Sequence, residues 1–166
     1  MKAASVHEIK QALLSNSSKE LAELCLRLAK FKKENKELLT YLLFEAHNEE
    51  AYIAEVNQQI SEEFDEIDPG QNLYFVKKTL RKILRIASKH IRYTGSKQAE
   101  VAILLHYSLT LKKSGIPFMK STALANLYKQ QIKKIHAAIS TLHEDLQYDY
   151  LQMMNELAIY NDFLNY

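Results

Sequence analysis

The amino-acid sequence predicts an all-α fold of seven or eight amphipathic helices, arranged as a bundle or as a short solenoid-like stack of helical hairpins. Apolar residues recur with a 3.6-residue period along nearly all of the 166 residues. Gly occurs three times and Pro twice, so the chain has few of the tight turns that a β-rich fold needs. The hydrophobic fraction of 47% is typical of a soluble globular protein, and we expect a single domain over residues 1–166.

Three helices are expected before residue 48. Ser5 with Glu8, and later Ser17 with Glu20, have the capping-box spacing that opens a helix. The first helix should run to about residue 14, and the second should place one apolar face made of Leu21, Leu24, Leu28 and Phe31. A third helix is expected over about residues 36–47, with Asn35 as its N-cap.

The single cysteine, Cys25, lies between two leucines of the second helix. A single cysteine excludes an intramolecular disulfide, and we expect Cys25 to be a small apolar core residue.

Three segments within the first 42 residues resemble a family of small, uncharacterised, all-helical bacterial proteins; they are IKQALL at 9–14, SKEL at 18–21 and KELLTYL at 36–42. The resemblance implies a small helical protein of the bacterial cytoplasm and carries no known activity.

A break at Asp68-Pro69-Gly70 separates two strongly patterned helices. The helix before it begins at Asn48 and carries an apolar stripe of Tyr52, Ile53, Val56, Ile60, Phe64 and Ile67. The helix after it, over about 72–93, has an apolar stripe within roughly 100° of arc and a basic face on the other side. That basic face consists of Lys77, Lys78, Arg81, Lys82, Arg85, Lys89 and Arg92.

Gly95 should close this helix in a left-handed conformation, and Ser96 should cap the next one. The next helix, about 97–113, is apolar on several sides, which is typical of a central buried helix.

From Ser121 to the C-terminus there is neither Gly nor Pro. An unbroken helix there would be about 60 Å long, whereas a domain of this size is about 40 Å across. We therefore expect a break near 140–143, with a capping box at Thr141 and Glu144; the alternative is a protruding helix that packs on another subunit.

Charge is sorted along the chain by segment. Residues 37–68 contain ten carboxylates and no Lys or Arg, residues 69–143 contain fourteen Lys and Arg and one carboxylate, and residues 144–166 contain five carboxylates and no Lys or Arg. The basic face could contact an external anionic partner, such as nucleic acid or an acidic protein. The favoured interpretation is internal neutralisation by the acidic helix at 48–67 and by a C-terminal line of Asp145, Asp149, Gln152 and Glu156.

The motifs of common catalytic and metal sites are missing from the sequence. There is no HExxH, no Glu-x-x-His, no Gly-x-Ser-x-Gly and no glycine-rich phosphate loop. We therefore predict no catalytic residue, no metal ligand and no cofactor, and we expect His106, in the most apolar helix, to be a hydrogen-bonded core residue.

Tyrosines and methionines gather towards the C-terminus, which indicates either a core helix or a homodimer surface; they include Tyr148, Tyr150, Met153, Met154, Tyr160 and Tyr166.

The leading functional hypothesis is a non-enzymatic helical protein that acts as a scaffold or interaction partner, either with another protein or with itself. The first alternative is a nucleic-acid-binding accessory protein that uses the basic helix at 77–92. The second is an enzyme with a site between helices. The sequence has no apolar run of about 18 residues and no signal-peptide pattern, so we expect a cytoplasmic protein without a membrane or small-molecule partner.

Overall fold

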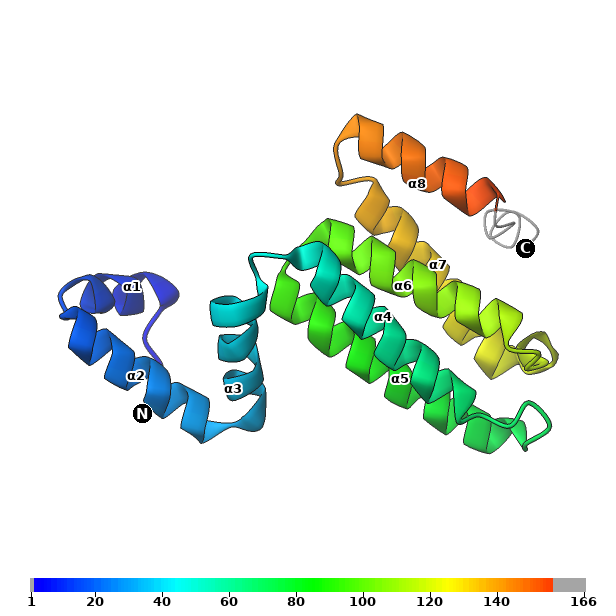
Figure 1. Cartoon of the computed structure of the whole chain (residues 1–166), viewed down its shortest axis with the longest axis horizontal. Coiled ribbons are helices and arrows are strands. Elements are labelled where there is room, and N and C mark those ends of the chain that lie inside the picture. Colours follow the sequence, from blue (N-terminus) through cyan, green and yellow to red (C-terminus); the bar gives the residue numbers. More distant parts are fainter. Residues whose placement is uncertain (1, 157–166) are drawn as a thin grey trace. The chain divides into compact units, whose positions relative to one another are not determined.

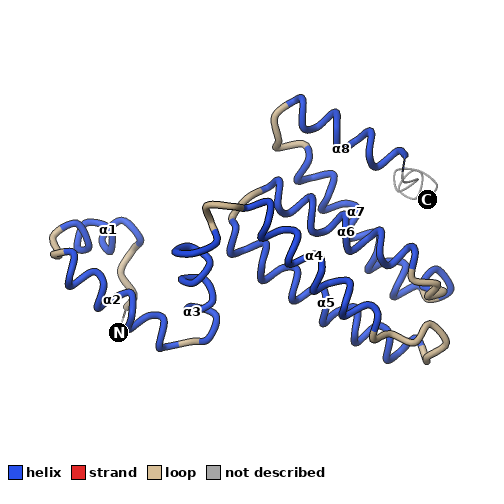
Figure 2. Tube along the Cα trace, in the orientation of Figure 1, coloured by secondary structure: helices blue, strands red, loops and turns tan. Residues whose placement is uncertain are grey.

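The computed structural model describes residues 2–156, and these residues form eight α-helices, a π-helical turn and a short 3-10 helix (Figure 1). No strand occurs among them, which confirms the predicted all-α fold (Figure 2). In chain order the elements are α1 (Val6–Leu14), α2 (Ser18–Phe31), α3 (Lys33–Thr40), η1 (Tyr41–Glu45), α4 (Glu49–Asp65), α5 (Leu73–Thr94), α6 (Lys97–Lys113), η2 (Phe118–Lys120), α7 (Thr122–Ile139) and α8 (Glu144–Glu156).

The chain divides into two compact units, Met1–Glu45 and Ala46–Tyr166. The division falls between η1 and α4, where the sequence shows no Gly, Pro or low-complexity linker. The smaller unit contains α1, α2, α3 and η1, and the larger unit contains the remaining elements.

Both predicted capping boxes of the smaller unit are formed. The backbone N–H of Glu8 donates to Ser5 Oγ over 3.3 Å, and the backbone N–H of Ser5 donates to Glu8 Oε2 over 2.7 Å. Ser17 and Glu20 repeat this arrangement with the same two distances. The hydrogen bonds from the two serines lower the pKa of both carboxyl groups. Each box satisfies backbone donors that would otherwise have no partner at the start of its helix.

The third helix differs from its prediction. It begins at Lys33 rather than near residue 36, and its N-cap, Lys32, makes no capping hydrogen bond with its side chain. The predicted cap, Asn35, instead donates from its side-chain nitrogen to the carbonyl oxygen of Leu28 over 2.9 Å, across the turn from α2. The α-helix ends at Thr40, where the chain continues as the π-helical turn.

The smaller unit encloses almost none of its apolar side chains. Its three α-helices contain no buried residue, and within the unit only Tyr41 of η1, which is 4% exposed, is buried among the described residues. The prediction that Cys25 is a core residue is wrong, because the thiol is exposed. Three helices of 9, 14 and 8 residues are too short to surround a core of their own.

The larger unit is built around α6, as its apolar pattern predicts. Helix α6 packs against α4, α5 and α7, while α4 and α5 pack against each other and α8 packs on α7 (Figure 1). The predicted stripe is confirmed for Tyr52, Val56, Ile60 and Phe64 of α4 and for Ile67, which follows the helix; all five are buried, whereas Ile53 is half-buried. Helix α5 contributes Val76, Leu80 and Ile83, and α6 contributes several fully buried side chains, among them Ile103, Tyr107 and Leu111.

Local signals set most helix ends in this unit. Asn48 caps α4 by accepting from the backbone N–H of Ala51 over 3.1 Å, and Ser96 caps α6 by accepting from that of Ala99 over 3.2 Å. Gly95 follows α5 with φ of 62°, a left-handed conformation that glycine adopts without a steric cost. The predictions for Gly95 and Ser96 are confirmed, and the helix predicted to begin at Asn48 begins at Glu49, with Asn48 as its N-cap.

The predicted break before the last helix is also confirmed, because α7 ends at Ile139 and α8 begins at Glu144. The predicted capping box is wrong. The hydroxyl of Thr141 donates to the carbonyl oxygen of Ala138 over 2.7 Å, at the end of α7. The backbone N–H of Asp145 lies 3.5 Å from His143 Nδ1, so the side chain of His143 stands at the start of α8.

Candidate functional site

The strongest candidate site is the basic face of α5. The helix is amphipathic over its whole length, and its apolar side fixes its orientation: Val76, Leu80 and Ile83 are 0% exposed against the rest of the unit. At 3.6 residues per turn, the cations between them point away from this core. All seven predicted residues lie on α5; Lys78, Arg81, Lys82, Arg85 and Arg92 are exposed, and Lys77 and Lys89 are half-buried.

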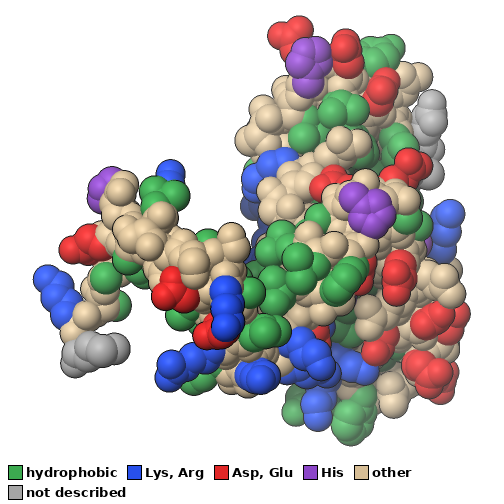
Figure 3. All heavy atoms as spheres, turned by 60° about the vertical axis from the view of Figure 1, so that its left-hand side comes forward, with side chains coloured by type: hydrophobic (Ala, Val, Ile, Leu, Met, Phe, Trp, Pro, Cys, Tyr) green, Lys and Arg blue, Asp and Glu red, His purple; other side chains and the backbone are tan. Residues whose placement is uncertain are grey.

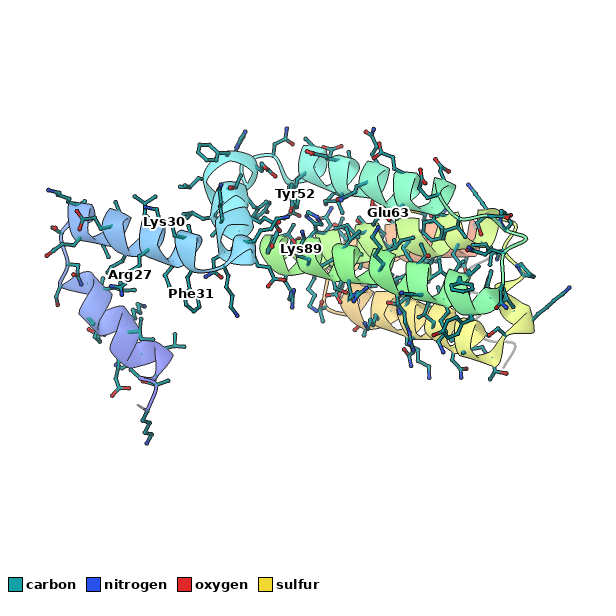
Figure 4. All side chains as sticks on the ribbon, turned by 90° about the horizontal axis from the view of Figure 1, so that it is seen from below. Arg27, Lys30, Phe31, Tyr52, Glu63 and Lys89 are labelled. Carbon is teal, nitrogen blue, oxygen red and sulfur yellow. The ribbon has the colours of Figure 1, made fainter. Side chains whose placement is uncertain are left out.

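Helix α4 approaches α5 at one side of this face. The Nζ atom of Lys82 lies 2.7 Å from Glu63 Oε2 and forms an ion pair between the two helices. Figure 4 shows Tyr52 and Lys89 near one end of the α4–α5 pair, with Glu63 farther along α4. The two helices are therefore antiparallel neighbours, as their short connection predicts.

Five other cations of the face differ from Lys82. Within residues 2–156, Lys77, Lys78, Arg81, Arg85 and Arg92 make no ion pair. Direct pairing with α4, as the favoured sequence interpretation predicts, is thus present for Lys82 and absent for these five cations within the described residues; neutralisation of the whole face stays a prediction. The C-terminal acidic line does not reach α5 in the described residues either, because α8 packs on α7; the side chain of Glu156 lies outside the described part.

The carboxylates of α4 lie along a different side of α5. A surface hollow of about 490 Å³ is lined by Gln59, Glu62, Glu63, Glu66, Thr79 and Lys82. At about 100° per residue, Thr79 and Lys82 lie roughly 100° around the helix from Lys78 and Arg81. Figure 3 shows acidic side chains gathered on one side of the larger unit, at the right of the view. This separation of sides explains why an acidic neighbour leaves the basic face unpaired.

Four of these five cations, all except Arg92, line a second, open hollow of about 530 Å³. Two of its lining residues are not charged: Tyr74 is 71% exposed and Leu84 is half-buried. Sequence reasoning missed both, because Leu84 belongs to the apolar stripe and Tyr74, although its helical position places it on the basic side, carries no charge. The hollow is lined by Tyr74, Lys77, Lys78, Arg81, Leu84 and Arg85. Cationic groups beside an aromatic ring and an aliphatic surface can bind an anion that carries an apolar or flat group.

A polar pair between α4 and α6 is the nearest approach to an enzyme-like arrangement. Ser61 Oγ lies 2.8 Å from His106 Nε2, a distance at which a base can activate a hydroxyl. Burial lowers the pKa of His106. However, Ser61 lies inside α4 and its hydroxyl is also 3.1 Å from the carbonyl oxygen of Asn57. Backbone N–H groups inside a helix are used by the helix itself, so they cannot act as oxyanion donors.

We therefore interpret Ser61 and His106 as a packing contact. The prediction that His106 is hydrogen-bonded is confirmed, although the ring is half-buried rather than fully enclosed. Among the described residues, no group of three or more His, Cys, Asp or Glu side chains could hold a metal ion. None of the described helices combines the length and the apolarity needed to cross a membrane.

The C-terminal aromatic cluster is only partly described. Tyr148 on α8 is 68% exposed and Met153 is 43% exposed, whereas Met154 is buried. Tyr160 and Tyr166 lie outside the described residues. The choice between a core helix and a homodimer surface stays a prediction here.

No protein-family model matches the chain, and neither the curated proteins nor the solved structures give a match. The resemblance of the N-terminal segments to small helical bacterial proteins also stays a prediction. The functional argument therefore depends on the geometry of the described residues.

Proposed function

We propose that this protein is a non-enzymatic helical binding protein whose basic face on α5 contacts the phosphates of a nucleic acid. The observation that carries the proposal is the set of five cations on one face that have no carboxylate partner within the described residues. Cations of this kind release condensed counterions when they contact phosphates, and this release supplies most of the affinity of non-specific nucleic-acid binding.

The arrangement of the cations supports a linear polyanion. Lys78, Arg81, Arg85 and Arg92 follow each other at spacings of three, four and seven residues, which places them along one line of the helix. From Lys78 to Arg92 this line is about 21 Å long. Phosphates of one DNA strand repeat at about 3.4 Å along a duplex axis, so the line can meet several of them at once.

The test is the binding of a fluorescently labelled oligonucleotide of about 16 nucleotides, followed by anisotropy between about 50 and 200 mM salt. We expect log Kd to vary linearly with log salt concentration, and we expect Arg81→Glu with Arg85→Glu to weaken binding at least about tenfold. The matched control is Lys133→Glu with Lys134→Glu, which changes the net charge equally on exposed residues of α7.

Two results would contradict the proposal. Equal losses in the two double variants would mean that net charge, rather than the α5 face, controls binding. If polyglutamate of equal charge displaced the oligonucleotide as well as unlabelled oligonucleotide does, the face would be a site for an acidic protein instead.

A second function, self-association, is supported by the smaller unit. Leu24, Leu28 and Phe31 of α2 are 41%, 62% and 77% exposed, and Figure 4 shows Phe31 projecting from α2. With Leu21 they have the alternating spacing of three and four residues that pairs helices in coiled coils. Helices this short are marginal in water unless their apolar side is covered. Because each copy supplies such a stripe, we propose that a second copy covers it.

Sedimentation velocity over a range of protein concentrations tests the second proposal. We expect a dimer that Leu28→Glu with Phe31→Glu converts to a monomer. Leu26→Glu is the control, because Leu26 is also exposed but lies on the opposite side of α2 from Phe31. A monomer at all concentrations, or equal effects of the two changes, would overturn self-association through this stripe.

A further inference from the structure

Two exposed aromatic side chains stand at the beginning of α5. Tyr74 is 71% exposed and Phe75 is 53% exposed. Their ring centroids are 5.4 Å apart and the rings are nearly perpendicular, at 82°. An aromatic ring contributes most to stability or binding when it is buried. Within the described chain, both of these rings stay largely exposed to solvent.

Tyr74 belongs to the same surface as the cations. It lines the 530 Å³ hollow together with Lys78, Arg81 and Arg85. These residues follow Tyr74 at four, seven and eleven positions, so the ring and the three charges lie on one side of the helix. A ligand that fills the hollow therefore meets the ring and the cations together.

This combination discriminates between anionic partners. A carboxylate on an acidic protein gains from the cations but has no flat group for the ring. In a duplex the faces of the bases are stacked on each other, so the ring cannot reach them. A single strand exposes both its phosphates and its base faces, and proteins that bind single strands combine a cationic track with aromatic side chains on which bases stack.

We propose that the α5 hollow binds single-stranded nucleic acid, with one base stacked on Tyr74 and the adjoining phosphates along Lys78, Arg81 and Arg85. This inference rests on the proposed nucleic-acid function and specifies the form of the ligand. The recognition is independent of base sequence, because each base presents a flat face and the charges contact only the backbone.

The experiment compares a labelled single-stranded oligothymidylate of about 12 nucleotides with a duplex of the same length by anisotropy. We expect Tyr74→Ala to weaken single-strand binding by about 5-fold to 100-fold, in line with the loss of one stacked base. Tyr74→Phe keeps the ring and should bind nearly as the natural chain does. Tyr148→Ala is the matched control, since Tyr148 is a 68% exposed tyrosine on α8.

The salt dependence separates stacking from charge. Tyr74→Ala removes no phosphate contact, so the slope of log Kd against log salt should not change. Arg81→Glu with Arg85→Glu should lower the magnitude of that slope by about 1.4, because each phosphate contact of a single strand contributes about 0.7. Because the chain contains no tryptophan, Tyr74→Trp introduces a single indole whose fluorescence a stacked base should quench.

The outcomes distinguish this inference from the function on which it rests. Equal binding of single strand and duplex, with no effect of Tyr74→Ala but a loss in the arginine double variant, would overturn the single-strand inference and leave the proposed function intact. Failure of the natural chain to bind either nucleic acid at low salt would overturn both. Preferential single-strand binding that depends on Tyr74 supports both.

Discussion

Lys82 Nζ lies 2.7 Å from Glu63 Oε2 and joins α5 to α4, whereas its neighbour Arg81 makes no ion pair within the described residues. The two side chains are adjacent in sequence but point about 100° apart on the helix. This difference decides which cations of α5 stabilise the fold and which are available to a partner.

Charge reversal should therefore affect stability unequally along α5. Lys82→Glu places two carboxylates together and should cost up to about 1 kcal/mol, which lowers Tm by about 2–4 °C in a chain of this size. Arg81→Glu with Arg85→Glu should leave Tm unchanged or slightly higher. Differential scanning calorimetry checks both. A large loss in the arginine double variant would show that the face is paired inside the protein after all.

Tyr107→Phe should increase the free energy of unfolding. Its side chain is 0% exposed and its hydroxyl has no hydrogen-bond partner in the described part of the chain. Burial raises the pKa of this phenol, so the group stays neutral. A buried polar group without a hydrogen-bond partner destabilises the fold by about 1–3 kcal/mol. Tyr107→Phe removes this group, so the free energy of unfolding measured in urea should rise by part of that amount.

The matched variant is Tyr52→Phe. The phenol oxygen of Tyr52 lies 2.6 Å from His90 Nδ1, so this change removes a hydrogen bond instead of an unsatisfied group. We expect it to cost about 1 kcal/mol. Effects of the same sign in the two variants would contradict this account of Tyr107.

Acid should weaken the fold through His106. Burial lowers the pKa of His106 below its ordinary value near 6.5, and burial has the same effect on His136. At pH values between the folded and unfolded pKa of His106, the unfolded chain binds more protons than the folded chain. The free energy of unfolding therefore has its full value above pH 6.5, and it falls as the pH drops from there through the folded pKa.

Urea unfolding at about pH 7.5 and about pH 5.5 measures this dependence above the range where carboxyl groups titrate. His106→Gln should make the free energy of unfolding less dependent on pH, with His136 accounting for what remains. An unchanged dependence in His106→Gln would exclude His106 as its source.

Gly95 should tolerate few replacements. Its φ of 62° is left-handed, and an added Cβ would meet no atom within 4 Å, so the cost is conformational rather than steric crowding by neighbours. Gly95→Ala should lose about 1–2 kcal/mol. Gly95→Asn should lose less, because Asn adopts this conformation more readily. Equal losses in thermal unfolding would argue against this explanation.

The elements that sequence predicted well are those whose signals are local. Gly95 and Ser96 mark the end of one helix and the start of the next through their own backbone preferences, and the apolar stripe of α4 identifies its buried side. Cys25 shows where this reasoning stops, because a pattern indicates an apolar face but not whether another element covers it. The sequence predicts Asn35 as a cap, yet its side-chain amide donates to the carbonyl oxygen of Leu28 across the turn between α2 and α3, which the local pattern does not encode.

The candidate site was predicted in part for the same reason. The seven cations of α5 follow from helical periodicity, but their pairing depends on the side from which α4 approaches. Tyr74 carries no charge and lies in the first turn of α5, so the charge pattern does not single it out, whereas the structure places it beside Arg81 in the lining of the hollow. The contact between Ser61 and His106 joins residues 45 positions apart, a separation that no local pattern encodes.

Because the acidic side of α4 and the open side of α5 face different directions, folding leaves charge of opposite sign separated across the larger unit instead of cancelling it. A protein with such a charge distribution experiences a torque in the electric field of a polyanion and rotates before contact. The α5 side would then face the polyanion at the moment of encounter, and the carboxylates of α4 would face away from it. For the polyanionic partner proposed above, this charge separation would raise the fraction of productive collisions, and the association rate would fall as ionic strength rises.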